Sequence, residues 1–144
     1  MGKNVVSTGV SQNYLLLVEG KNDQHETPTP GGTIIQQSGK PTVGIWIMPD
    51  NKIAGMLEDF VGLLRPKDDL LWPLAADAVR KVKALEEQYR FRDALESKAR
   101  IHTWLAWQKE PGKPMGQAIT ARYLDAEAPH ARELITWIRR LFEL

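Results

Sequence analysis

Two short apolar stretches near the start of the chain decide its fold: YLLLV at residues 14–18, which ends at Glu19-Gly20, and TVGIWIM at residues 42–48, which ends at Pro49-Asp50-Asn51. Both stretches are continuous rather than alternating, a pattern typical of strands buried on both faces of a sheet. The β-branched segment 33–35 predicts a third strand, joined to the second stretch through the turn-like residues 38–41. The sequence therefore predicts a small central sheet of two to four strands.

From residue 52 onward the hydrophobic pattern becomes helical. Apolar residues recur at intervals of three and four in several segments, and these predict helices. The segments are a helix that starts at Asp50 or Asn51 and has its apolar stripe over 53–64, then helices over 71–85, 93–108 and 129–142, and a short one over 115–123. We expect a single α/β domain over 1–144, with a strand-rich part at 1–51 that includes the Pro/Gly segment 26–32, and a mostly helical part at 52–144.

Composition limits the classes of function. The 144 residues are 42% hydrophobic and 26% charged, which is ordinary for one globular domain. With 19 basic and 18 acidic side chains, the net charge of +1 excludes a strongly polybasic nucleic-acid binder, but it does not exclude a local basic patch. The absence of cysteine excludes disulfides, thiolate metal sites and a cysteine nucleophile. Because no long apolar run and no secretory signal is present, we expect a cytoplasmic protein without membrane contact.

Acidic residues follow both predicted strands. Glu19 ends the first strand and Asp50 follows the second, at the position where open α/β sheets bind ligands. Glu58 and Asp59 follow on the next helix, and such oxygen ligands suit Mg²⁺, so Glu19, Asp50, Glu58 and Asp59 are the candidate metal ligands. Simpler alternatives stay open: a solvated strand end for Glu19, an N-cap for Asp50 and a solvent-exposed position for Asp59.

Positive charge gathers in the helical part. Residues 78–122 hold ten basic and five acidic side chains, a net charge of +5, whereas residues 44–69 hold three basic and five acidic, a net charge of −2. A basic surface beside an acidic cluster is typical of metal-dependent nucleic-acid enzymes, and it is also typical of solvated helices. The candidate nucleic-acid contacts are Arg80, Lys81, Lys83, Arg90 and Arg92.

Other chemical classes lack their motifs. The chain contains no HExxH, no GxSxG elbow and no Walker or dinucleotide glycine motif. Trp104 and Trp107 lie three residues apart on one predicted helix, and Trp137 lies on the last one. These tryptophans predict core packing, and the alternatives are stacking against nucleic-acid bases or an apolar helical face for an interface.

Several segments carry a family resemblance. LLLVEGKNDQH (15–25) resembles the opening motif of Toprim domains, which topoisomerases, primases and OLD-family nucleases share. VGIWIMPDN (43–51) and GMLEDF (55–60), with KARIHTWLAWQ (98–108) and WIRRLF (137–142), are similar to a bacterial and cyanobacterial Toprim-like family of unknown function. The resemblance implies that Glu19 is the Toprim glutamate, a general acid or base or a metal ligand. It also implies a second acidic position at Glu58 with Asp50 or Asp59, and an assisting lysine at Lys98.

One part of the Toprim pattern is missing. Toprim sites need an Asp-x-Asp pair, and no such pair occurs in this chain. The Pro/Gly segment 26–32 also cannot form the helix of a parallel crossover. An internal deletion of one α/β unit explains both absences.

The expectation is thus an incomplete Toprim-like fold of unknown function that is catalytically impaired and binds Mg²⁺ or nucleic acid weakly. One alternative is a Mg²⁺-dependent, nuclease-like phosphodiester hydrolase. The other is a non-catalytic module that forms homo-oligomers through a sheet edge or the tryptophan-rich helical face.

Overall fold

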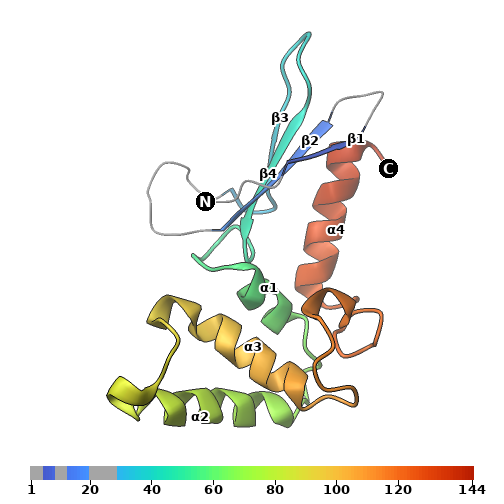
Figure 1. Ribbon diagram of the computed structural model, residues 1–144. Coiled ribbons are helices and arrows are strands. Elements are labelled where there is room, and N and C mark those ends of the chain that lie inside the picture. The colour runs from blue at the N-terminus through green and yellow to red at the C-terminus, as the bar shows by residue number, and fades with distance from the viewer. Residues whose placement is uncertain (1–4, 9–12, 20–28) are drawn as a thin grey trace. The chain divides into compact units, whose positions relative to one another are not determined.

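The computed structural model describes residues 5–8, 13–19 and 29–144 (Figure 1). All strands in this part of the chain precede residue 49, and they are β1 (Val5–Thr8), β2 (Asn13–Glu19), β3 (Thr33–Ile35) and β4 (Val43–Met48). The α-helices are α1 (Leu57–Leu63), α2 (Leu71–Lys83), α3 (Glu96–Ala106) and α4 (Pro129–Phe142). Short 3₁₀ helices are η1 (Glu86–Gln88), η2 (Asp93–Leu95) and η3 (Met115–Gln117). The predicted α/β class with a mostly helical C-terminal half is confirmed.

The four strands form one mixed sheet in the order β1-β2-β4-β3. β2 and β4 pair in parallel, from Tyr14 opposite Val43 to Glu19 opposite Met48. β1 pairs antiparallel with β2, and β3 pairs antiparallel with β4 as its segment predicted. The two apolar stretches therefore lie side by side and run in the same direction.

The chain divides into two compact units. One contains Met1–Phe60 together with Pro129–Leu144, and the other contains Val61–Ala128. We call the first the sheet unit and the second the helical unit. The prediction of a single domain over residues 1–144 stays a prediction.

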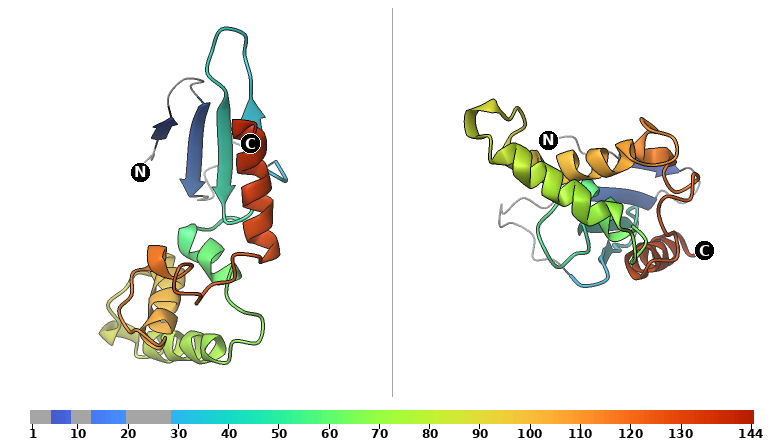
Figure 2. Two further views of the ribbon diagram at one scale, coloured as in Figure 1. Left: turned by 90° about the vertical axis from the view of Figure 1, so that its right-hand side faces the viewer. Right: turned by 90° about the horizontal axis from the view of Figure 1, so that it is seen from below.

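In the sheet unit, α4 packs along one face of β4 (Figure 2). Gly44, Trp46 and Met48 alternate along β4 and are all buried. The indole rings of Trp46 and Trp137 lie 5.3 Å apart between centroids and are tilted by 52°. Burying a large apolar side chain stabilises the folded state by about 1.5–3 kcal/mol. The tryptophan pair is therefore a main source of stability for this unit.

In the helical unit, α2 and α3 pack against each other. Trp72 meets Trp104 edge to face, with ring centroids 6.2 Å apart. One carboxylate oxygen of Asp69, Oδ1, accepts hydrogen bonds from the Trp72 backbone N–H at 2.7 Å and from the Trp104 indole N–H at 3.0 Å. Asp69 thereby fixes the first turn of α2 to the buried side of α3.

Three predicted helices differ from the observed ones. α1 begins at Leu57 instead of Asp50 or Asn51, so Ile53, predicted on the apolar stripe, is 60% exposed. The segment 93–108 starts as the 3₁₀ turn η2 before α3, and the segment 115–123 forms only η3. In contrast, the segment predicted at 129–142 forms a helix with those bounds.

Candidate functional site at the carboxyl ends of β2 and β4

The parallel pairing of β2 and β4 brings the carboxyl ends of both strands to one edge of the sheet. Glu19 is the last residue of β2 and lies opposite Met48, the last residue of β4. Asp50 follows two residues later. The two acidic positions therefore share the edge where the sequence predicted a site, although the side chain of Glu19 lies outside the part that the structure describes.

Asp50 is only 9% exposed, and its carboxylate is engaged by the backbone. Its Oδ1 accepts hydrogen bonds from the N–H groups of Lys52 at 3.0 Å and Ile53 at 3.2 Å. This arrangement closes the turn after β4. It accounts for one of the two carboxylate oxygens of Asp50.

Asn51 also lies at this edge, and the sequence analysis considered it only as a possible helix start. It is 2% exposed, and its backbone adopts a left-handed conformation with φ of 58°. Its Oδ1 accepts a hydrogen bond from the Ile47 N–H at 2.8 Å, and its own N–H donates to the Ile47 carbonyl at 2.8 Å. Within the described part of the chain, its buried side-chain amide nitrogen, Nδ2, has no hydrogen-bond partner. The Pro-Asp-Asn sequence signalled a turn, but it did not signal an orphan donor.

Glu58 and Asp59 lie in the first turn of α1. Negatively charged side chains at this end of a helix are stabilised by the helix dipole. Glu58 is 8% exposed. Asp59 Oδ2 accepts a hydrogen bond from the Met56 N–H at 2.9 Å and so caps the helix. Asp59 was predicted, as one alternative, to be exposed to solvent. In the structure it is half-buried and caps the helix.

No three His, Asp or Glu residues within the described ranges form a group that could hold a metal ion. Because the Glu19 side chain lies outside those ranges, the metal set of Glu19, Asp50, Glu58 and Asp59 stays a prediction. Mg²⁺ is commonly held by only one or two carboxylates together with water. The donor chemistry at this edge is therefore compatible with a sparsely liganded cation.

Lys98, the predicted assisting lysine, is exposed on α3 of the helical unit. Glu19, Asp50 and Glu58 belong to the sheet unit. The catalytic role of Lys98 stays a prediction.

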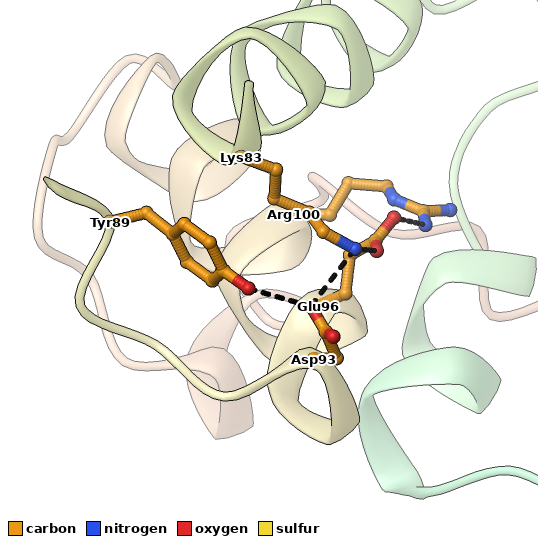
Figure 3. Close-up of polar contacts among 5 residues, drawn as sticks. All are labelled: Lys83, Tyr89, Asp93, Glu96 and Arg100. Carbon is orange, nitrogen blue, oxygen red and sulfur yellow. Dashed lines mark hydrogen bonds and ion pairs between the residues drawn. The ribbon is translucent and has the colours of Figure 1, made fainter. Parts of the chain in front are cut away.

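Three of the five predicted nucleic-acid contacts are ion-paired within the helical unit. Arg80 and Lys81 both pair with Asp77, at 2.8 Å from Lys81 Nζ. Lys83 Nζ lies 2.7 Å from Glu96 Oε2 and 3.2 Å from Asp93 Oδ1 (Figure 3). The remaining two, Arg90 and Arg92, are exposed in the connection between η1 and η2.

These contacts shift the ionisation of the groups involved. The hydrogen bond from Lys83 lowers the pKa of Glu96 and, together with a hydrogen bond from Tyr89, that of Asp93. The same pairs raise the pKa of Lys83, with Glu96 the larger cause. Lys81 and then Arg80 lower the pKa of Asp77. All these groups are charged at neutral pH, so the positive charge of α2 is largely balanced by neighbouring carboxylates.

An open hollow of about 460 Å³ lies beside these ion pairs in the helical unit. Its lining includes the carboxylates of Asp77 and Glu96 and the cations of Arg80, Lys83 and Arg100. Because each of these cations is paired with a carboxylate, the hollow does not present a concentrated positive surface.

The tryptophans mostly serve the two cores. Trp104 and Trp137 are 0% and 1% exposed, and only Trp107 of the three predicted interface tryptophans remains at the surface, at 42%. Among the described residues, no helix is both long and apolar enough to cross a membrane.

A family model described as "Protein of unknown function (DUF3226)" matches residues 25–143, which include Asp50, Glu58 and Asp59 but not Glu19. No curated protein and no solved structure matches the sequence. Since the matched segment covers most of the 144 residues, the chain belongs to DUF3226, a family of proteins of unknown function.

Proposed function

We propose that this chain is a reduced Toprim-like protein that does not hydrolyse phosphodiester bonds and that binds a divalent cation weakly at the carboxyl edge of β2 and β4. The observation that carries the proposal is the parallel register that ends both strands at Glu19 and Met48. Such an edge is where open α/β sheets bind ligands.

The cation binding rests on buried acidity at this edge. Asp50 and Glu58 are both less than 10% exposed, at 9% and 8%. Carboxylate oxygens are the ligands that Mg²⁺ prefers in proteins, and both residues belong to the sheet unit. We propose Glu19, Glu58 and the Oδ2 atom of Asp50 as its ligands. The orphan Asn51 Nδ2 is a donor, so it fits the oxygen of water or phosphate and not the cation.

The loss of hydrolysis follows from what the carboxylates already do. No Asp-x-Asp pair is present, Asp50 gives one oxygen to two backbone N–H groups, and Asp59 caps α1. Phosphodiester hydrolysis relies on metal ions that hold both the attacking and the leaving oxygen. A site with so few carboxylates is expected to bind a cation loosely without positioning it for that reaction.

Thermal unfolding with added metal tests the cation site. If the dissociation constant is about 1 mM, 10 mM Mg²⁺ stabilises the fold by about 1.4 kcal/mol, which raises the Tm by about 5 °C. Glu19→Gln and Glu58→Gln should each abolish most of this shift. Asp68→Asn, an exposed acid of the helical unit, is the matched control and should keep it. An equal shift in all variants would refute the proposed site.

A cleavage assay tests the absence of hydrolysis. Supercoiled plasmid incubated with the protein and Mg²⁺ or Mn²⁺ should remain intact. Cleavage that disappears in Glu19→Gln would instead establish the nuclease-like hydrolase. Nucleic-acid binding without cleavage stays a prediction. Because three of its five residues are engaged in ion pairs, we expect such binding to be weak.

We also propose a cytoplasmic location. The support is the cysteine-free composition, which is compatible with a reducing compartment.

A further inference from the structure

The open hollow of the helical unit lies between α2 and α3, and we call it the α2–α3 groove. The residues that line it from α2 recur at intervals of three or four, so they share one side of that helix; they are Pro73, Ala76, Asp77, Arg80 and Lys83. From α3 it is lined by Glu96 and Arg100, which are one helical turn apart. Its volume of about 460 Å³ lies within the range of about 300–1,000 Å³ that is usual for small-molecule sites. The groove is therefore large enough for a small organic ligand.

Two small apolar residues form the part of the groove that carries no charge. Pro73 and Ala76 are its apolar lining residues, and both belong to the first half of α2. Ala76 offers only a methyl group, so its side chain fills little of the space at this level. The apolar part of a ligand would leave water here, which favours its binding.

Arg100 has spare hydrogen-bond donors at the groove. A guanidinium group carries several N–H donors in a planar fork. Among the described residues, Arg100 donates one hydrogen bond, from Nη2 to Glu96 Oε1 at 3.3 Å, and its buried Nε has no partner (Figure 3). Its guanidinium carbon lies 5.8 Å from the centre of the Trp72 ring, and its side chain is 32% exposed. Arg100 is thus held in place by Trp72 and Glu96 while part of its fork remains unused.

The charges of the lining favour a ligand with a single negative charge. Three cations and two carboxylates line the groove, which leaves a net charge of +1. A hydrogen bond from Lys83 lowers the pKa of Glu96, and hydrogen bonds from Lys81 and then Arg80 lower the pKa of Asp77, so both carboxylates are ionised at neutral pH. One negative charge neutralises the lining, whereas a second would be repelled by Asp77 and Glu96.

We propose that the α2–α3 groove binds a small organic monocarboxylate, whose carboxylate accepts hydrogen bonds from Arg100 and whose apolar part lies against Pro73 and Ala76. A carboxylate is planar and matches the fork of a guanidinium group, so it can accept two parallel hydrogen bonds. A phosphate group carries close to two negative charges at neutral pH and fits the net charge of the lining less well. The groove belongs to the helical unit, so this proposal does not rest on the cation site of the sheet unit.

An NMR titration with benzoate tests the proposal, because benzoate joins one carboxylate to a flat apolar ring. The signals of Trp72 and Arg100 should shift and saturate, with a dissociation constant of about 1–10 mM for so small a ligand. Benzamide has the same shape without the charge. It should bind about ten-fold more weakly or less, since it lacks the second anionic acceptor for the guanidinium fork.

Two variants place the ligand in the groove. Ala76→Leu keeps every charge but fills the apolar part, and it should weaken benzoate binding about ten-fold or more. Ala106→Leu, at an exposed position of α3 outside the lining, is the matched control and should leave the affinity unchanged. Arg100→Lys keeps the positive charge but removes the fork, and it should also weaken binding about ten-fold. Circular dichroism of each variant reports whether the fold is kept.

Four results would overturn the proposal. They are signal shifts that do not saturate by about 50 mM benzoate, equal affinity for benzamide, tighter binding of inorganic phosphate than of benzoate, and an unchanged affinity in folded Ala76→Leu. If Arg100→Lys fails to fold, the comparison of Ala76→Leu with Ala106→Leu decides the matter, because neither substitution alters a hydrogen bond or an ion pair of a side chain.

Discussion

Gly44 shows how a single residue sets the distance between β4 and α4. A Cβ atom at this position would collide with the side chain of Leu141 and would lie 2.9 Å from Trp137 Cζ2. Both of those side chains are 1% exposed, so neither has room to move aside. The absence of a side chain at residue 44 is therefore a condition for the close packing of helix on sheet.

We expect Gly44→Ala to destabilise the protein by about 1–3 kcal/mol, because overpacking forces side chains away from their preferred rotamers. Urea denaturation followed by tryptophan fluorescence measures the change. Gly116→Ala is the control, because a Cβ there meets nothing within 4 Å and the residue does not adopt a positive φ. An equal loss in both variants would mean that the collision with α4 is not the cause.

Single residues also mark the limit of what the sequence could predict about the site. The strand ends and the edge that they share were predictable from the apolar runs and their order. The acidic residues Asp50 and Glu58 are visible in the sequence itself. Asp50 closes a turn and Asp59 caps α1, but the sequence alone could not distinguish these structural roles from metal binding. A carboxylate has the same composition in each role, and only its neighbours distinguish them.

At the scale of elements, one lysine links three segments of the helical unit. Lys83, at the end of α2, contacts Asp93 of η2 and Glu96 of α3 (Figure 3). Glu96 also accepts a hydrogen bond from Arg100 at 3.3 Å. These ion pairs hold the connection between α2 and α3 closed.

The pKa shifts of this cluster predict a dependence of stability on pH. Because the folded pKa values of Asp93 and Glu96 are lowered, their contribution is present above the ordinary carboxyl values of 3.8 and 4.5 and is lost as the pH falls through the folded values. Lys83→Met should therefore lower the Tm at pH 7 but much less at pH values below this window. The raised pKa of Lys83 adds a contribution that is lost only when the pH rises above 10.5.

Lys67→Met is the control for this pH series, because it removes an exposed positive charge of the same unit. Its effect on Tm should be small and nearly constant with pH. A pH profile of Lys83→Met parallel to that of the unmodified protein would contradict the assigned role of the ion pairs.

Elements differed in how well the sequence predicted them. α4 was predictable because its apolar and charged residues alternate with helical period over a long stretch. The start of α1 was not, since apolar Ile53 matches the helical pattern while the left-handed Asn51 and the cap at Asp59 delay the helix until Leu57. β1 carries only two apolar residues and was not predicted. Its pairing with β2 supplies the support that its own short sequence lacks.

At the scale of the whole molecule, each of the two units has a core of its own. Leu141 is 1% exposed in the sheet unit, and Ile101 is 0% exposed in the helical unit. Truncating either side chain leaves a cavity in one core only.

We expect Leu141→Ala to cost about 2–5 kcal/mol and to speed amide hydrogen exchange in β2, β4 and α4 about 30-fold or more, with little change in α2 and α3. Ile101→Ala should give the reverse pattern. Hydrogen exchange followed by mass spectrometry reads both units in one sample. Uniform acceleration across the chain in both variants would show that the two units unfold together.

The sheet unit is assembled from segments on either side of the helical unit, and this order matters during translation. The ribosome releases the whole of Val61–Ala128 before it releases α4, so the helical unit is complete while β4 still lacks its covering helix. Until α4 leaves the ribosome, the side chains of Trp46 and Met48 lack their covering helix and contact water or a chaperone. A nascent chain stalled before Pro129 would therefore hold one finished core and one unfinished core, and the unfinished one is the part exposed to aggregation in the cell.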